Sequence, residues 1–309
     1  MFLICGEALY DIFTRGEAGP AMRMEAHRGG SPYNVAIGLA RLGSEAAFFG
    51  GLSDAPLGVA LRAALAAEGV ETRFAPTKAA PVTLSLIQLD EGGSPRYAFY
   101  GHETADRVLE PSDIPALPEE IDALHFGSFS LVVEPCGSTL LNFAKAQAGQ
   151  RLIAYDPNVR PTVEPDLALW RAKLEAWLHI ADMVKVSQED LELLYPGEDP
   201  LAIARGWLGL NPVLAVVTRG AEGAVAFSAI GEIAVPAPAI TVVDTVGAGD
   251  TFQAALLHGL ARAGHLSRTG LQTLTQEALT AILHFAVAAS ALTCTRAGAD
   301  LPRAAELGA

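Results

Sequence analysis

The sequence predicts an α/β protein with a doubly wound, mostly parallel sheet between two layers of helices, together with a small β-sheet lid. Apolar runs of strand length alternate with longer helical patterns, which is typical of a parallel sheet with helices on both faces. Half of the 309 residues are hydrophobic, so the chain can bury a large core. Two stretches in the first third interrupt the alternation and resemble paired short strands.

The first two thirds of the chain supply the main sheet and its helices. Apolar runs indicate buried strands at Phe2–Cys5, Ala46–Phe49, Ala123–Phe126, Leu152–Tyr155, Met183–Val186 and Val213–Val217. Helical patterns lie between them, at Tyr33–Leu42, Leu57–Glu68, Ser138–Ala148, Leu167–His179 and Leu201–Leu208.

A hairpin is the first interruption. Thr83–Leu89 and Arg96–Tyr100 flank the turn Glu91–Ser94 and predict two antiparallel strands. Residues from about Thr14 to Arg28 are similarly strand-like, with no helix between them.

Both interruptions are assigned to one small sheet, formed from about 12–28 and 72–103, that projects from the main domain. Such a sheet could cover a site as a lid. No repeat, low-complexity tract or linker occurs, so a single domain over 1–309 is expected.

The C-terminal third predicts a second hairpin and two long helices. The hairpin pairs Ala224–Phe227 with Glu232–Val235, and a further strand is expected at Ile240–Val243. One helix opens near Gly247 and the other runs from about Gln276 to Leu292.

Charge and composition exclude several classes of protein. The formal net charge is −14 and no Lys or Arg run occurs, which argues against a nucleic-acid or anionic-membrane partner. The three cysteines lie far apart, so neither a disulfide framework nor a zinc site is predicted. The longest apolar stretch, Ala281–Thr293, is too short to span a bilayer, and the N-terminus begins with a strand rather than a signal peptide. A cytoplasmic protein is expected.

The most informative segment is the glycine turn within Asp244–Phe252, where the predicted strand meets the helix. N–H groups at a helix start lack intrahelical partners, and the helix dipole adds partial positive charge. Without Cβ atoms at Gly247 and Gly249, a phosphate can approach the backbone closely. The backbone of Gly247, Ala248 and Gly249 is therefore a predicted anion hole for a transferring phosphoryl group. A merely structural capped helix remains the alternative.

Asp250 lies inside the same turn and is the predicted catalytic base. The helix terminus should keep it ionised, and in a loose phosphoryl-transfer transition state the position of a base matters more than its strength. Two other phosphate motifs are excluded. A Walker A loop needs Gly-Lys, which occurs nowhere in the chain, and the dinucleotide fingerprint needs glycine where Phe252 stands.

The segment DTVGAGD at 244–250 resembles the second signature of the PfkB, or ribokinase-like, carbohydrate kinases, and further similarities extend from Gly6 to Gly298. The resemblance implies a ribokinase-like fold. It also implies a sugar site at GGSPYNVA (29–36), where Gly29 and Gly30 would let the sugar lie against the backbone. Asn34 would hydrogen-bond a sugar hydroxyl, as would Asp11 at the end of GEALYD (6–11).

The resemblance also implies a nucleotide and magnesium site. KVSQED (185–190) aligns with the family's N-x-x-E element, although Ser187 replaces Asn and Asp190 replaces Glu. Asp190 would organise magnesium waters, with Glu189 as a stand-in. The segment 218–223 resembles the family's nucleotide loop, which implies contacts from Thr218, Gly220 and Gly223.

Two further segments complete the predicted site. DPNVR (156–160) follows a strand at the sheet edge where ligands bind and resembles the fructokinase branch, so Asn158 and Arg160 are candidates for sugar or phosphate contact. A loop-anchoring ion pair is the alternative for Arg160. Asp244, Val246 and Cys294–Ala299 resemble carbonyl-rich loops that hold a monovalent cation, so potassium activation is expected.

The sequence thus predicts a kinase that uses ATP and Mg²⁺ to phosphorylate a sugar, with fructose as the leading acceptor. Within the class, 2-keto-3-deoxygluconate kinase is the nearest alternative, ahead of ribokinase and nucleoside kinase. A non-catalytic sugar or nucleotide sensor is the alternative from another class. The departures at Ser187 and Asp190 favour it weakly, as does Ala55, which replaces an acidic residue in a segment (50–58) that resembles the family's first signature; the intact Asp250 argues against it. Pairing through the lid into a homodimer is expected.

Overall fold

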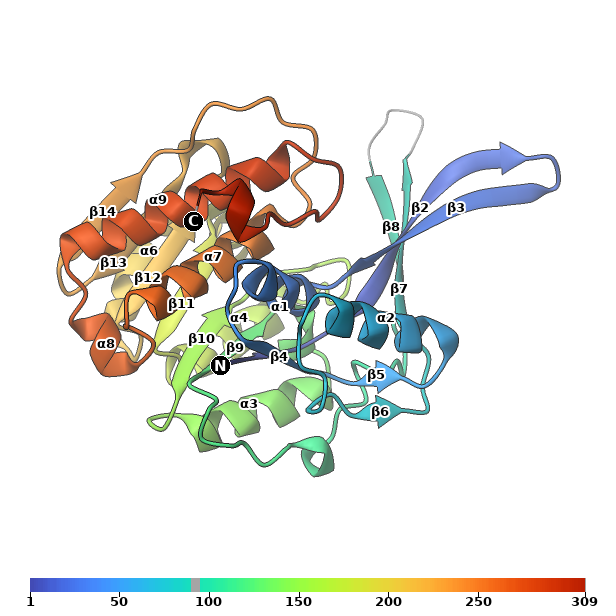
Figure 1. Ribbon diagram of the computed structural model, residues 1–309, viewed down its shortest axis with the longest axis horizontal. Helices are drawn as coiled ribbons and strands as arrows, with labels where there is room; N and C mark the ends of the chain where they lie inside the picture. The colour runs from blue at the N-terminus through green and yellow to red at the C-terminus, as the bar shows by residue number, and fades with distance from the viewer. Residues whose placement is uncertain (90–94, 309) are drawn as a thin grey trace.

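The computed structural model describes residues 1–89 and 95–308 (Figure 1). The predicted turn Glu91–Ser94 lies outside the described residues. The main sheet has eight strands in the order β14-β13-β12-β11-β10-β9-β1-β4. The six neighbouring strands β4, β1, β9, β10, β11 and β12 are parallel to one another. β13 and β14 follow β12 as an antiparallel edge. Their bounds are β1 Phe2–Cys5, β4 Ala46–Phe49, β9 Ala123–Gly127, β10 Leu152–Asp156, β11 Met183–Ser187, β12 Leu214–Thr218, β13 Ala224–Ser228 and β14 Gly231–Val235.

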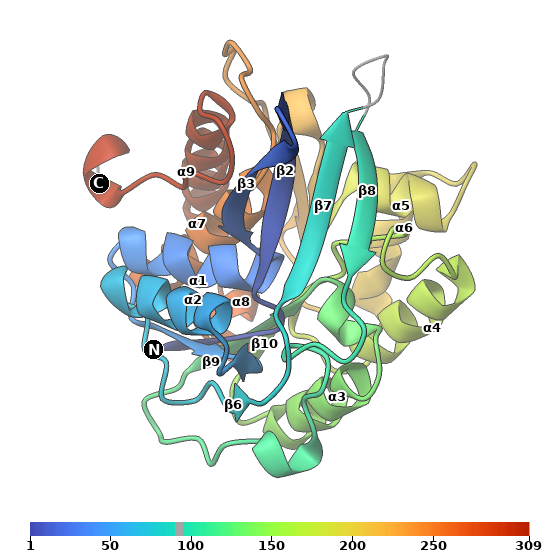
Figure 2. The same cartoon turned by 90° about the vertical axis from the view of Figure 1, so that its right-hand side faces the viewer.

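Helices cover both faces of this sheet, which confirms the predicted three-layer architecture (Figures 1 and 2). One apolar core is shared with α1 (Ser31–Arg41), α2 (Pro56–Ala67), α7 (Ala248–Arg262), α8 (Arg268–Gln272) and α9 (Gln276–Cys294). The opposite core is shared with α3 (Cys136–Gln147), α4 (Leu167–Leu178), α5 (Gln188–Leu194) and α6 (Pro200–Gly206).

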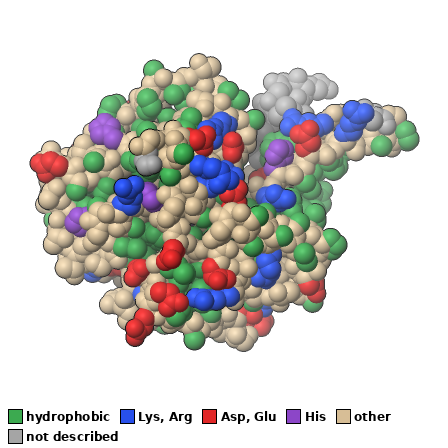
Figure 3. Space-filling view, viewed as in Figure 1, with side chains coloured by type: hydrophobic (Ala, Val, Ile, Leu, Met, Phe, Trp, Pro, Cys, Tyr) green, Lys and Arg blue, Asp and Glu red, His purple; other side chains and the backbone are tan. Residues whose placement is uncertain are grey.

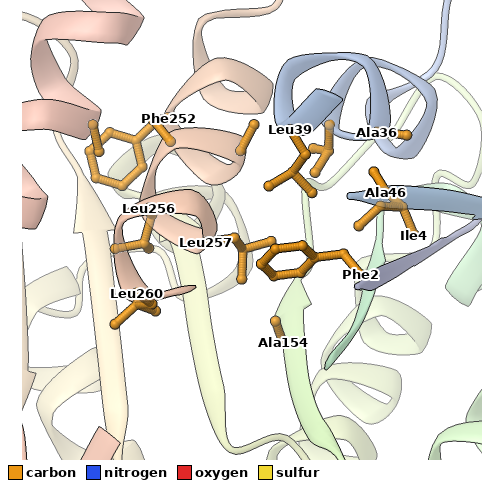
Figure 4. Packing of buried hydrophobic residues seen from close by; sticks show 14 of the residues in the cluster. Phe2, Ile4, Ala36, Leu39, Ala46, Ala154, Phe252, Leu256, Leu257 and Leu260 are labelled. Atoms are coloured by element: carbon orange, nitrogen blue, oxygen red, sulfur yellow. The ribbon is translucent and has the colours of Figure 1, made fainter. Parts of the chain in front are cut away.

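The two cores follow from the alternation of side chains along each strand. In β1, Phe2 and Ile4 face the α1 and α7 side, whereas Leu3 and Cys5 face the other. All four side chains are buried, which is why this strand reads as a continuous apolar run. Figure 4 shows Phe2 beside Leu257 of α7, so the core residues of the first strand hold the helix that carries the glycine turn.

One predicted strand is wrong. Ile240–Val243 is not a strand but part of an irregular segment between β14 and α7. Its Ile and Val side chains are substantially exposed, and the backbone N–H of Val243 donates to the carbonyl of Cys294 at 2.8 Å. β14 is the edge strand of the sheet, and this segment does not pair with it; the segment is joined instead to the end of α9 through the carbonyl of Cys294.

The last long helix, α9, begins at Gln276 as predicted and continues two residues beyond its predicted end, to Cys294. By length and composition alone its 19 residues are enough to cross a bilayer, so the prediction that the longest apolar stretch is too short does not hold for the whole helix. In this fold α9 packs against α7 and β14. Its apolar composition therefore serves a packed interior helix.

The additional small sheet has four strands in the order β3-β2-β7-β8 (Figure 2). β2 (Leu9–Ala18) pairs antiparallel with β3 (Ala21–Gly29) and parallel with β7 (Thr83–Leu89), which pairs antiparallel with β8 (Pro95–Tyr100). Residues 72–82 do not join it, because β6 (Thr77–Lys78) pairs instead with β5 (Leu52–Ser53).

The β2–β3 hairpin projects well beyond the main body (Figures 1 and 3). Met22 and Met24 of β3 are 56% and 51% exposed and, two residues apart, share one face of the strand. The small sheet thus presents apolar side chains away from the core.

Candidate active site

The candidate site lies where the carboxyl ends of the parallel strands meet the start of α7. Three neighbouring strands end here: β10 at Asp156, β11 at Ser187 and β12 at Thr218. Ser187 and Thr218 are paired in register. Ligands of open α/β sheets bind at this edge.

The glycine turn forms the N-terminus of α7, as predicted. Gly247 is the N-cap residue in a left-handed conformation, and Ala248 is the first helical residue. The N–H of Ala248 donates to Thr245 and that of Thr251 to Gly247. Between them, the N–H groups of Gly249 and Asp250 belong to the first turn, where no intrahelical acceptor exists. These groups are available to an anion.

Asp250 lies in the first turn of α7 and is anchored by two residues of α1. Ser31 Oγ donates to its Oδ1 at 2.6 Å, and Asn34 Nδ2 donates to its Oδ2 at 2.8 Å. The carboxylate is 9% exposed. The amide of Asn34, which is predicted to bind a sugar hydroxyl, donates here to the predicted base; its contact with a sugar stays a prediction.

The pKa of Asp250 is raised from its ordinary value, chiefly by burial. Hydrogen bonds from Ser31 and Asn34 oppose the rise, as do the charges of Lys185 and Arg160. We expected the helix terminus to keep Asp250 a weak base; burial works against that expectation, because it disfavours the charged form.

Asp11 and the glycine pair lie on the lid side of Asp250. Asp11 is in β2, opposite β3, and a Cβ atom on Gly29 would lie 2.5 Å from its Oδ2. Gly30 is left-handed, with φ +104°, and a Cβ there would lie 2.8 Å from the carbonyl oxygen of Glu7. Burial raises the pKa of Asp11, and the nearby Asp250 carboxylate adds to the rise. The carboxyl groups of Asp11 and Asp250 therefore face one region, next to the Gly29–Gly30 backbone, which has no Cβ atoms.

Glu7 contacts the start of α1, beside this region. The sequence did not predict it as a site residue. Its carboxylate is buried and accepts hydrogen bonds from Ser130 Oγ at 2.6 Å and from the N–H of Ser31 at 3.3 Å. Burial raises its pKa to about 7. Glu7 thus fixes the start of α1, which carries both partners of Asp250.

The loop after β10 brings Arg160 to the same region. Asn158 adopts a left-handed conformation with φ 41°, and Arg160 Nη1 donates to the carbonyl of Val159. The Arg160 guanidinium is exposed, and its charge lowers the pKa of both Asp11 and Asp250. Arg160 is therefore close to two of the predicted residues, Asp11 and Asp250.

Asp190 holds that loop in place. Its Oδ1 accepts the N–H of Val159 at 3.1 Å, while its own N–H donates to Ser187 Oγ, which caps α5. Burial raises the pKa of Asp190. Its predicted stand-in, Glu189, is exposed. Across residues 1–89 and 95–308, no cluster of three or more His, Cys, Asp or Glu could hold a metal ion by itself.

The predicted nucleotide loop joins β12 to β13. Thr218 ends β12, Gly220 opens a short 3₁₀ turn, and Gly223 closes it with φ +91°. A Cβ at Gly223 would lie 2.0 Å from the carbonyl oxygen of Val235, so the loop is fitted closely against the end of β14.

The two segments predicted to hold a monovalent cation are side by side. Asp244 Oδ2 accepts the N–H of Gly298 at 2.8 Å, and its Oδ1 accepts the N–H of Val246 at 3.0 Å. The carbonyl of Cys294 accepts the N–H of Val243 at 2.8 Å. One carboxylate therefore clamps the two loops together beside the start of α7.

The sequence interpretation also missed Ser31 and Lys185. Ser31 was read only as part of the glycine segment, although a hydroxyl directly after two glycines and before a helix is a signal for a capping or site residue. Lys185 stands inside the apolar strand Met183–Ser187, where a charge has to be compensated. Its partner is Asp156, at 2.8 Å.

This arrangement fits a small-molecule kinase: a carboxylate beside a helix N-terminus, with a second carboxyl group and a glycine backbone on one side and an open sheet edge on the other. Residues 4–305 match the model of the "pfkB family carbohydrate kinase". The chain therefore belongs to the pfkB family of carbohydrate kinases, which are phosphotransferases that act on a sugar hydroxyl.

Relatives and solved structures agree with this family. The chain is 37% identical over 279 residues to a fructokinase of Rhizobium leguminosarum bv. trifolii, covering 90% of this chain and 85% of that protein. A fructokinase of Klebsiella pneumoniae is 36% identical, with 84% of each chain covered. The structure of a Xylella fastidiosa fructokinase with bound ATP matches with a TM-score of 0.89 and 27% identity, covering 99% of this chain and 96% of that one.

Proposed function

We propose that this kinase transfers the γ-phosphate of ATP to a hydroxyl of fructose. The observation that carries the proposal is Asp250, which is anchored by Ser31 and Asn34 in the first turn of α7, close to Asp11 and Arg160. Fructose is favoured as the acceptor because the fructokinases of Rhizobium and Klebsiella resemble the chain over most of its length.

In the proposed reaction, Asp11 and Asp250 orient the sugar against the Gly29–Gly30 backbone. Asp250 accepts the proton of the attacking hydroxyl as the new oxygen–phosphorus bond forms. The raised pKa of Asp250 suits this role, because a base is most effective when its pKa approaches the operating pH. The N–H groups at the start of α7 stabilise the charge on the phosphoryl oxygens.

The sheet edge is proposed to bind the nucleotide, with Thr218, Gly220, Gly223 and the cap Ser187 along one side. A magnesium ion bound with the nucleotide would neutralise phosphate charge. Among the described residues, no group of three or more His, Cys, Asp or Glu side chains could hold this ion. We propose that phosphate oxygens and water provide most of its ligands, and that Asp190 or Glu189 binds the water molecules around it.

A potassium ion is proposed at the loops joined by Asp244, with Val246 and the 294–299 segment as its neighbours. A double mutant of a Vibrio cholerae fructokinase, 26% identical to this chain with a TM-score of 0.84, has been solved with fructose, ADP and a potassium ion bound. We also propose a cytoplasmic homodimer paired through the lid, as the exposed Met22 and Met24 suggest.

The test is ADP release from Mg-ATP with fructose, 2-keto-3-deoxygluconate, ribose or adenosine, each with and without potassium. Asp250→Asn is the control and should lose roughly 10²–10⁴-fold in turnover. Fructose-dependent release that disappears in the variant is the expected result. Release with another acceptor would replace fructose, and nucleotide binding without turnover on a wider sugar panel would favour a sensor.

A further inference from the structure

Three polar side chains form a row under the start of α7, on one face of the central sheet. They are His125 of β9, Asp156 of β10 and Lys185 of β11. His125 is in register with Ala154, two residues before Asp156, so both side chains point to the same face. The opposing helix completes the row, because Gln253 Nε2 of α7 lies 3.2 Å from His125 Nδ1.

The charged members of this row form a buried ion pair. Lys185 Nζ lies 2.8 Å from Asp156 Oδ2, and the two side chains are only 5% and 1% exposed. Removing two charges from water costs several kcal/mol per ion, and well-packed apolar residues often give equal or better stability. Stability alone is therefore a poor reason for this pair.

The ammonium group of Lys185 is directed at the glycine turn. A Cβ atom built on Gly249 would lie 3.2 Å from Lys185 Nζ, which among the described residues is the one atom within 4 Å of that position outside Gly249's chain neighbours and the helix's own backbone. Its charge also counteracts the rise in the pKa of Asp250 and of Asp190. The ammonium is thus next to the free N–H groups of α7 and to the predicted base.

We propose that Lys185 is a catalytic residue, whose ammonium contacts the γ-phosphate oxygens beside the N–H groups of Gly249 and Asp250. Asp156 is a positioning residue that aims the ammonium. As the sugar oxygen bonds to phosphorus, the bond from phosphorus to the leaving ADP oxygen breaks. The sugar proton passes to Asp250, and Lys185 keeps its own proton throughout. This inference rests on the proposed function, because it identifies Lys185 as the positively charged side chain that binds the phosphate in that site.

The competing explanation is that Lys185 only neutralises Asp156 within the core. Lys185→Met leaves a buried carboxylate without its partner, so loss of activity in that variant alone would not separate the two explanations. The double variant Asp156→Asn with Lys185→Met removes both charges together. If Lys185 has only a structural role, the double variant should recover turnover and ATP affinity. If Lys185 is catalytic, the double variant should recover neither.

The experiment measures ATP and ADP affinity by calorimetry, along with turnover, in both variants and in Lys78→Met. The last variant removes a lysine that pairs with Asp113 away from the site, and serves as the matched control. Binding is included because it tests Lys185 even if fructose proves to be the wrong acceptor.

We expect both Lys185 variants to bind ATP about 10- to 100-fold more weakly while ADP affinity changes little, since one charge-assisted contact to the γ-phosphate is lost. Turnover should fall by roughly 10²–10³-fold, as when an oxyanion donor is removed. Equal weakening of ATP and ADP, or recovery of ATP affinity in the double variant, would overturn the proposal. Wild-type protein that binds ATP but phosphorylates no sugar would overturn the proposed function alone.

Discussion

Asn34 Nδ2 donates to Asp250 Oδ2 at 2.8 Å, a contact between residues 216 positions apart. Together with Ser31 it links the start of α1 to the start of α7, so two helix N-termini meet at one carboxylate. The hydrogen bonds favour the charged form of Asp250, against the burial that disfavours it. This balance determines the pH at which the carboxylate can accept a proton.

Removing either donor should therefore raise the pKa of Asp250 further. Ser31→Ala and Asn34→Ala should each move the acidic limb of the pH–rate profile to higher pH and lower the turnover. Hydrogen bonds to charged groups are worth about 1.5–3 kcal/mol, which corresponds to roughly one to two pH units. The pH dependence of kcat/KM for the sugar measures the shift. A lower rate with an unmoved limb would contradict this account.

Much of the fold was predictable because buried parallel strands are encoded locally as short apolar runs. β1, with Phe2–Cys5 buried on both faces, illustrates this. The same rule failed at Ile240–Val243, because a strand also has to pair with a partner strand. This segment does not pair with the edge strand β14, and its local sequence carries no information about that pairing.

The position of the glycine turn at the start of a helix was predictable, because one segment, Gly247–Asp250, carries that pattern. Contacts between distant segments were not predictable. The Ser31 hydroxyl and the Asn34 amide meet the Asp250 carboxylate only after the chain has folded, and no local pattern connects positions so far apart in the sequence. Lys185 had a local signal, a charge within an apolar strand, but its partner Asp156 is set by strand order.

Glu7 should make the stability of the protein depend on pH. Its pKa is about 7 in the folded protein, above the ordinary value of 4.5, so folding favours its protonated form. Its stabilising contribution is complete below pH 4.5 and is lost as the pH rises to about 7. The shift corresponds to roughly 3 kcal/mol.

Glu7→Gln offers the comparison, because its amide can donate to Ser130 Oγ while its oxygen accepts from Ser31, and Ser130 can still donate to the carbonyl of Gly127 at 3.0 Å. The free energy of unfolding of wild type relative to the variant should fall between pH 4.5 and 7. Urea denaturation across that range measures it, and a difference that does not vary with pH would show that the carboxyl group titrates normally.

Gly30→Ala should damage both stability and activity. The new Cβ would lie 2.8 Å from the carbonyl oxygen of Glu7, and the position has φ +104°. Backbone cannot move aside as a flexible side chain can, so the start of α1 has to shift and displace Ser31. Gly43→Ala is the control, since Gly43 has φ +89° but no atom within 4 Å of the new Cβ.

Both alanine variants bear the cost of a non-glycine residue at positive φ, about 1–3 kcal/mol. Only Gly30→Ala should lose additional stability and most of its sugar-dependent turnover. Thermal unfolding and ADP release measure the two effects. Equal losses in the two variants would mean that the close approach to Glu7 is unimportant.

Asp244 should couple the proposed potassium site to α7. Its carboxylate accepts hydrogen bonds from the N–H groups of Val246 and Gly298. The residue after Val246 is Gly247, the N-cap of α7. A cation bound by these loops would fix the position of the free N–H groups at the helix start. Asp244→Ala breaks both hydrogen bonds and should abolish stimulation by potassium, leaving a rate close to that of wild type in potassium-free buffer. Titration of potassium against sodium at constant ionic strength measures the effect. Equal stimulation of the variant and the wild type would remove Asp244 from the cation site, and an unstimulated wild type would remove the site itself.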